Sequence, residues 1–152
     1  MRKLSSVLGL IVLGGATALM CAARGEEAAS APAEEKPAVA EHRVVACYFH
    51  RTNRCPTCRK ISAYIEESLN NGLAKEMKDG SVSLQMIDFQ DPKNQKYTEA
   101  YKITGPTLVL MDVRDGKVAS WKPAPKVWSL VGKKDAFLKY VQDEVRAYLE
   151  TK

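Results

Sequence analysis

The sequence predicts an α/β fold, in which a four-stranded mixed sheet with the element order β-α-β-α-β-β-α is covered by helices. Residues 43–49 (RVVACYF) form an unbroken apolar run, which is typical of a strand buried on both faces of its sheet. Apolar residues then recur every four positions from Ile61 to Leu69, as on one face of a helix. An Asp-Gly pair at residues 115–116 lies between two short strand-like runs, which indicates a hairpin.

The first helix is expected to begin near Cys55, because Pro56 suits the first position of a helix, and to end at residues 70–72 (NNG). One further helical turn is expected over residues 73–77. Three more strands are predicted over residues 82–89, 107–113 and 118–121. Right-handed crossover makes the first two strands parallel, and the last two form an antiparallel hairpin.

Two more helices complete the predicted domain. A short one covers residues 93–101, and a last one begins at a cap on Asp135. Its buried stripe is expected to consist of Phe137, Val141, Val145 and Leu149. Residues 123–132 are expected to be irregular, with core contacts from Val127, Trp128 and Leu130.

The N-terminal part has a different composition. Residues 1–23 resemble an export signal, with a positive start, an apolar run from Leu8 to Met20, and cleavage expected after Ala23 or Ala18. An uncleaved membrane anchor or a lipid attached to Cys21 is the alternative. Residues 24–41 are mostly Ala, Glu and Pro and predict a disordered linker. We therefore expect a domain at residues 42–152 in an exported protein of the periplasm or cell envelope.

The predicted domain has a modest positive charge, with 19 Lys and Arg against 13 Asp and Glu. No basic run is interleaved with aromatic residues, which argues against nucleic-acid binding.

Residues 55–58 (CPTC) are the main candidate for chemistry. A disulfide between Cys55 and Cys58 would close almost no loop and would therefore stabilise the fold little. A cysteine at a helix N-terminus, with basic residues such as Arg54 and Arg59 nearby, is expected to have a lowered pKa. Cys55 is then the nucleophile in thiol–disulfide exchange, and Cys58 the resolving thiol.

Other interpretations of the cysteines remain open at this point. The pair could be a static disulfide, or Cys47, His50, Cys55 and Cys58 could form a Cys₃His metal set. Cys47 alternates with Val45 and is expected to be a small buried residue. His50 is either structural or close enough to Cys55 to assist its proton chemistry.

The CPTC sequence after the first strand, residues 105–107 (GPT) before the third, and the order of elements resemble the thioredoxin-like superfamily over residues 43–150. The resemblance implies that Pro106 is cis and lies against the cysteine pair. It also implies that Gly105 offers its backbone to an extended partner, by strand addition. Arg54 stands where thioredoxins carry Trp, and Cys47 or Tyr48 occupies the region of their buried acid.

More narrowly, residues 48–50 (YFH), 54–58 (RCPTC) and 127–132 (VWSLVG) look like the ArsF family. That family consists of exported thioredoxin-like proteins labelled as nitrophenyl compound nitroreductase subunits.

We therefore expect an exported thiol–disulfide oxidoreductase without a cofactor, exchanging electrons with a protein partner. A transmembrane thiol carrier is one such partner. The alternatives are a module that binds a soft metal or metalloid, and a redox-inert accessory subunit of a larger reductase complex. The expected site comprises the catalytic Cys55 and Cys58, the substrate-binding Gly105 and Pro106, and the supporting Arg54, Pro56, Thr57 and His50.

Overall fold

A computed structural model of the chain describes residues 41–151. The predicted signal and nearly all of the predicted linker lie outside the described residues. Within the described part, no helix is both long enough and apolar enough to cross a membrane.

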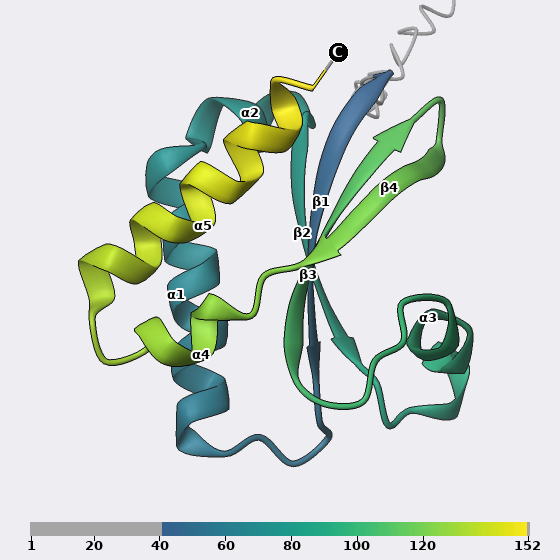
Figure 1. Cartoon of the computed structure of the whole chain (residues 1–152), viewed down its shortest axis with the longest axis vertical. Helices are drawn as coiled ribbons and strands as arrows, with labels where there is room; N and C mark the ends of the chain where they lie inside the picture. Colours follow the sequence, from purple (N-terminus) through teal and green to yellow (C-terminus); the bar gives the residue numbers. More distant parts are fainter. Residues whose placement is uncertain (1–40, 152) are drawn as a thin grey trace, which may run out of the picture. The chain divides into compact units, whose positions relative to one another are not determined.

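A single four-stranded sheet forms the centre of the described part (Figure 1). Its strands, in spatial order, are β2 (Val82–Asp88), β1 (His42–His50), β3 (Thr107–Arg114) and β4 (Lys117–Pro123). β1 is parallel to β2 and antiparallel to β3, and β3 is antiparallel to β4. The predicted parallel pair and the predicted hairpin are therefore both confirmed.

Helices cover both faces of the sheet, unequally. One face carries α1 (Pro56–Gly72), α2 (Ala74–Asp79), α4 (Lys126–Leu130) and α5 (Lys134–Leu149), and the other carries α3 (Gln95–Ala100) (Figure 1). A short 3₁₀ turn (Pro92–Asn94) precedes α3, so the helix predicted over residues 93–101 is split in two.

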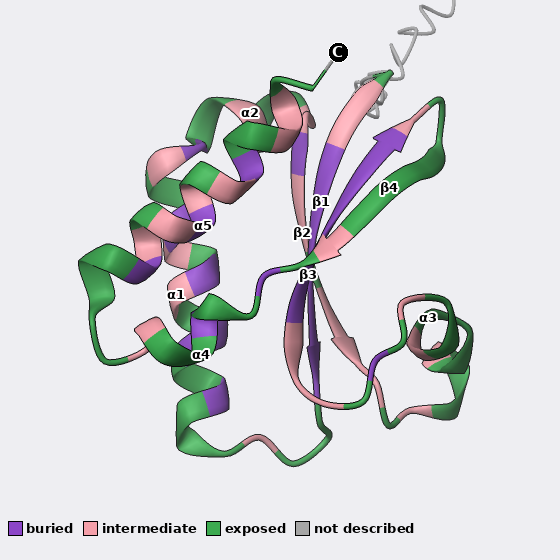
Figure 2. Cartoon of the chain, in the orientation of Figure 1, coloured by how far each residue is buried: buried purple, intermediate pink, exposed green. Residues whose placement is uncertain are grey.

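The buried residues form two clusters, one on each face of the sheet (Figure 2). The larger cluster packs α1 and α5 onto the sheet, with Tyr48, Ile61 and Phe137 fully buried. The smaller cluster contains Cys47 and Phe49, on the face near α3. Successive residues of β1 thus enter opposite cores, which is why its apolar run has no polar alternation.

Polar bonds fix how α1 and α5 pack. The Ser68 hydroxyl donates to the Leu138 carbonyl at 2.7 Å, and the Gln142 side chain donates to the Ser68 carbonyl at 3.0 Å. Because Ser68 is fully buried, its bonds must be satisfied within the protein. The position of α1 relative to the rest of the domain is therefore well defined, and so is that of its N-terminus.

The hairpin between β3 and β4 follows its predicted turn chemistry. Asp115 and Gly116 both have positive φ, at 50° and 74°. Two successive left-handed residues are what the favoured two-residue hairpin turns require, and Asp-Gly supplies them at little cost.

Two sequence predictions about the C-terminal part were wrong. The last helix is not capped by Asp135: Lys133 is the N-cap residue, without a side-chain cap bond, and Asp135 lies in the first turn. In that position, the negative charge of Asp135 is stabilised by the positive end of the helix dipole. Residues 123–132 are not irregular throughout, because they contain α4, and Trp128 on this helix is 38% exposed rather than buried in the core.

Candidate functional site

The cysteine pair lies where β1 leads into α1. β1 ends at His50, a loop follows, and Pro56 occupies the first turn of α1, where its missing N–H has no partner to lose. Cys55 is the N-cap residue, with extended backbone (φ −67°, ψ 161°), and its sulfur accepts a hydrogen bond from the Cys58 N–H at 3.2 Å. The nucleophile predicted from the sequence therefore also caps its helix, in the place of the usual oxygen.

The two cysteines differ in exposure. Both are free thiols in this structure. Cys55 is exposed, whereas Cys58, one helical turn further on, is only 7% exposed. An incoming disulfide can therefore reach Cys55 directly, whereas Cys58 is accessible mainly to Cys55.

Their pKa values shift in opposite directions. The pKa of Cys55 is lowered chiefly by a hydrogen bond from the Cys58 thiol, then by bonds from the backbone N–H groups of Cys58 and Thr57. The pKa of Cys58 is raised, first by burial and then by its side-chain bond to Cys55. The environment thus favours a thiolate on the exposed sulfur and a thiol on the buried one.

The basic residues near the pair act differently from what we expected. Hydrogen bonds, rather than the arginines, lower the pKa of Cys55. Arg54 donates to the Ser62 hydroxyl at 3.3 Å, and Arg59 donates to the Arg54 carbonyl at 3.2 Å. Both side chains therefore attach the loop before the pair to the first turns of α1.

A hollow of about 280 Å³ opens beside the pair. It is lined by Arg51, Asn53, Cys55, Cys58, Pro106 and Trp128. The structure therefore brings Pro106 next to the cysteines, although almost fifty residues separate them in the sequence. Trp128 was missed as a site residue, because its apolar neighbours suggested a core position; its presence in the VWSLVG segment was the only signal.

The predicted cis bond before Pro106 is not found. The described residues contain no cis peptide bond, so Gly105–Pro106 is trans. For an X–Pro bond the two isomers differ by only about 0.5–1 kcal/mol, so the surrounding structure decides between them. Here the Pro106 carbonyl accepts a hydrogen bond from the Trp128 indole N–H at 3.0 Å.

Gly105 lies at the edge of the same loop. A Cβ built on Gly105 would meet no atom within 4 Å, so the space around it is open. Its predicted backbone contact with an extended partner stays a prediction.

The other residues expected near the pair have different environments. His50 is 9% exposed, and its Nδ1 lies 3.0 Å from the Arg51 carbonyl, so its described bond is local. Tyr48 is fully buried, and its hydroxyl has no hydrogen-bond partner among the described residues. Burial, followed by the charge of Cys58, raises the pKa of Tyr48 to about 12.

Cys47 is separate from the pair. It lies in the cluster on the other face of the sheet, and burial raises its pKa to about 12. The hypothetical Cys₃His set with Cys47 and His50 is therefore not assembled. Across residues 41–151, no three His, Cys, Asp or Glu side chains are grouped so that they could hold a metal ion.

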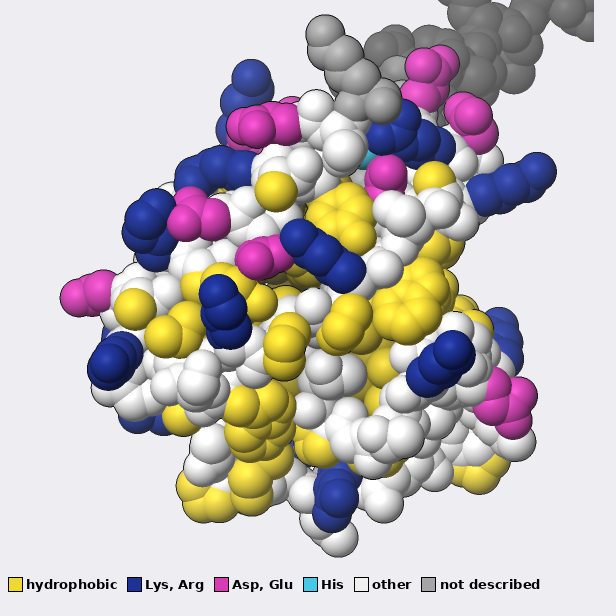
Figure 3. All heavy atoms as spheres, in the orientation of Figure 1, with side chains coloured by type: hydrophobic (Ala, Val, Ile, Leu, Met, Phe, Trp, Pro, Cys, Tyr) yellow, Lys and Arg dark blue, Asp and Glu magenta, His cyan; other side chains and the backbone are white. Residues whose placement is uncertain are grey.

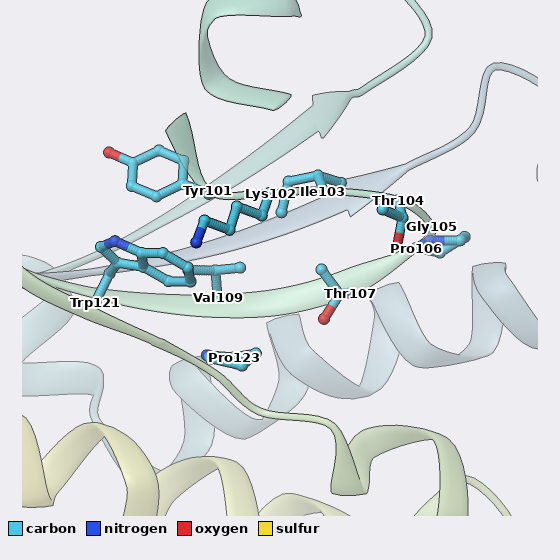
Figure 4. Close-up of a pocket in the computed structure, with 10 residues that line it drawn as sticks. All are labelled: Tyr101, Lys102, Ile103, Thr104, Gly105, Pro106, Thr107, Val109, Trp121 and Pro123. Carbon is cyan, nitrogen blue, oxygen red and sulfur yellow. The ribbon is translucent and has the colours of Figure 1, made fainter. Parts of the chain in front are cut away.

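A second hollow, of about 360 Å³, is lined by the loop before β3 together with residues of β3 and β4 (Figure 4). Its lining includes Tyr101, Lys102, Val109 and Trp121, and it also includes Pro106. The Tyr101 and Trp121 rings meet edge to face, with centroids 5.5 Å apart. Pro106 therefore lines both hollows, of which only one is lined by the cysteines.

One face of the molecule, which includes the helical layer and β4, carries both apolar and charged side chains. Figure 3 shows apolar side chains gathered between the helical layer and β4, with Lys and Arg scattered among acidic residues. This face carries no continuous basic patch.

No protein-family model and no curated protein matches the sequence. Among solved structures, the chain is similar to a thioredoxin variant from Halobacterium salinarum NRC-1, with 24% identity, TM-score 0.44, and 72% of this chain and 77% of that chain covered. It is also similar to a poplar thioredoxin h, with 18% identity, TM-score 0.43, and coverage of 72% and 79%. Human ERp44 matches with 18% identity and TM-score 0.45 over 68% of this chain and 27% of its own length.

These solved structures concern the fold only. The mixed sheet, its strand order and its helices are those of the thioredoxin-like fold predicted from the sequence.

Proposed function

We propose that this chain is an exported thiol–disulfide oxidoreductase that exchanges electron pairs with a protein partner through Cys55 and Cys58. The observation that carries the proposal is the asymmetry of the pair. One sulfur is exposed, caps α1 and has a lowered pKa, while the other is buried and has a raised pKa. A static structural bond needs neither difference, whereas an exchange reaction uses both.

The reaction has two steps when the dithiol acts as reductant. The Cys55 thiolate attacks one sulfur of the partner's disulfide; a mixed disulfide forms, and the partner's other sulfur leaves as a thiolate that takes up a proton. Cys58 then loses its proton and attacks the Cys55 sulfur, which releases the partner's second thiolate. Two electrons pass to the partner, and a Cys55–Cys58 disulfide remains. The reverse sequence oxidises a partner dithiol.

The structure suggests how Cys58 is activated for the second step. Once Cys55 is part of a mixed disulfide it no longer carries negative charge, so the interaction with Cys55 that raises the pKa of Cys58 is removed. Burial still protects Cys58 from other oxidants. The resolving thiol therefore becomes more acidic only after the partner has bound.

Export and the partner are further parts of the proposal, supported by sequence. The signal-like composition of residues 1–23 supports an address outside the cytoplasm. A reductase there requires electrons from across the membrane, which a transmembrane thiol carrier would supply. The alternative that the chain is an accessory subunit of a larger reductase complex comes from the resemblance of residues 54–58 and 127–132 to the ArsF family.

Turnover of a disulfide tests the proposed function. The full chain, with dithiothreitol as electron source, is expected to accelerate reduction of a disulfide-bonded reporter such as insulin. Cys55→Ser is expected to abolish the acceleration, and Cys58→Ser to stop it at the mixed disulfide. Cys47→Ala is the matched control, because it removes a cysteine from the opposite core.

Three results would contradict the proposal. An acceleration that survives Cys55→Ser would show that another group does the chemistry. A wild-type chain that binds a soft metal stoichiometrically and has both thiols blocked would favour the metal-binding alternative. If Cys55→Ser leaves the activity of a partner reductase unchanged, the chain is a redox-inert accessory subunit.

A further inference from the structure

The chain contains only two tryptophans, and each lines a hollow that Pro106 also lines. Trp128 lines the hollow that holds Cys55 and Cys58, and Trp121 lines the hollow that does not. The two side chains have nearly equal exposure, 38% and 36%. Because large exposed apolar groups beside a reactive atom commonly contact a partner, Trp128 stands out among the residues without an assigned role.

Trp128 is held firmly in its position. Its neighbour on α4, Val127, is fully buried in the main core. Its indole N–H donates to the Pro106 carbonyl at 3.0 Å. Both the backbone and the polar edge of the ring are thus fixed, and the ring itself needs no further polar partner. What the hollow presents beside the cysteines is therefore a rigid aromatic surface.

The walls of this hollow differ in chemistry. Trp128 and Pro106 form an apolar wall, and Arg51 and Asn53 form a polar one. A volume of about 280 Å³ lies at or below the lower end of the range for sites that enclose small molecules. It suits one or two side chains of a polypeptide whose disulfide lies over Cys55.

We propose that Trp128 is a specificity residue, which contacts an apolar side chain next to the reactive cysteine of the partner. The proposal rests on the proposed exchange function and names a feature of its substrate. Trp128 also acts as a positioning residue, because its bond to the Pro106 carbonyl holds the other residue of the apolar wall in place.

Two disulfide-linked peptides test the proposal. They differ in one residue beside the cysteine, leucine in one peptide and serine in the other. The reduced full chain is expected to react with the leucine peptide about 10-fold faster. That ratio corresponds to about 1.4 kcal/mol, which is within reach of burying part of a leucine side chain on an aromatic surface.

Three variants separate the contributions of Trp128. Trp128→Ala is expected to reduce the preference to about 2-fold or less, mainly by slowing the reaction with the leucine peptide. Trp128→Phe, which keeps a ring and loses the indole N–H, should retain most of the preference. Trp121→Ala, the matched control of equal exposure, should retain all of it.

Several results would overturn the inference. A Trp128→Ala chain that keeps the preference shows that the ring does not contact the partner. A Trp128→Ala chain that is slowed equally with both peptides shows that the role of Trp128 is only structural. If wild type reacts with both peptides at the same rate, the role of Trp128 is refuted and the proposed exchange function stands. If wild type reacts with neither peptide, the proposed exchange function is refuted as well.

Discussion

Cys47 provides a sharp test of how the fold divides the thiols into reactive and inert ones. Burial raises its pKa from an ordinary 9.0 to about 12. At pH 8, about one in ten ordinary thiols is ionised, against about one in ten thousand with a pKa near 12. Because the thiolate is the nucleophile, Cys47 should be alkylated about 1000-fold more slowly than an ordinary cysteine, before any steric protection is counted.

Peptide-resolved mass spectrometry after timed iodoacetamide labelling measures this rate separately for Cys47, Cys55 and Cys58. In the reduced, folded chain, we expect Cys55 to react first, Cys58 more slowly, and Cys47 only after unfolding. As the pH rises, labelling of Cys55 should increase earlier than that of an ordinary thiol, and labelling of Cys58 later. In concentrated guanidinium all three should react alike.

The reasoning would be refuted by either of two results. If Cys47 labels in the folded chain within about tenfold of an ordinary thiol, its core is open to solvent. If Cys58 labels before Cys55, the roles of nucleophile and resolving thiol are reversed. Cys47→Ala identifies the Cys47 signal unambiguously.

Three further predictions concern stability. Since the folded-state pKa of Cys47 is raised, its contribution to stability is complete below pH 9 and is lost as the pH approaches 12. Cys47→Ala should remove the part of this loss that falls between pH 8 and pH 11, about 2–3 kcal/mol, measured by urea unfolding at these two pH values. Tyr48→Phe removes a buried hydroxyl that has no hydrogen-bond partner among the described residues, so the free energy of unfolding should rise or stay within about 1 kcal/mol of wild type. A loss above about 2 kcal/mol would show that the hydroxyl is hydrogen-bonded in the folded chain. Phe137 is fully buried, and its ring meets the Tyr64 ring edge to face with the two ring centroids 5.4 Å apart. Phe137→Ala should therefore lower the free energy of unfolding by about 3–5 kcal/mol, measured in denaturant. A loss below about 1 kcal/mol would contradict the place of Phe137 in the core.

Much of the fold could be predicted because its signals are local. The unbroken apolar run of β1 and the Asp-Gly turn at residues 115–116 each follow from a few neighbouring residues. Pro56 likewise marks the start of α1 from its own backbone restriction. Local chemistry determined these elements, and the structure agrees with them.

The parts that could not be predicted depend on distant contacts. Trp128 and Pro106 are joined by a hydrogen bond across 22 residues, which no local pattern records. The trans bond before Pro106 likewise depends on its surroundings, because its two isomers are nearly equal in energy. The lowered pKa of Cys55 was expected, but its main cause, the Cys58 thiol, required the positions of both side chains.

Equilibrium redox titration of the full chain is the most direct test that Cys55 and Cys58 form a working redox couple. The chain is equilibrated with a series of glutathione or dithiothreitol buffers, and its oxidised fraction is read by thiol labelling and mass. We predict a reversible transition with two-electron slope that is lost in Cys55→Ser and in Cys58→Ser and is unchanged in Cys47→Ala. A pair that stays reduced or oxidised throughout the series, or a transition that persists without Cys55, would contradict the proposed function.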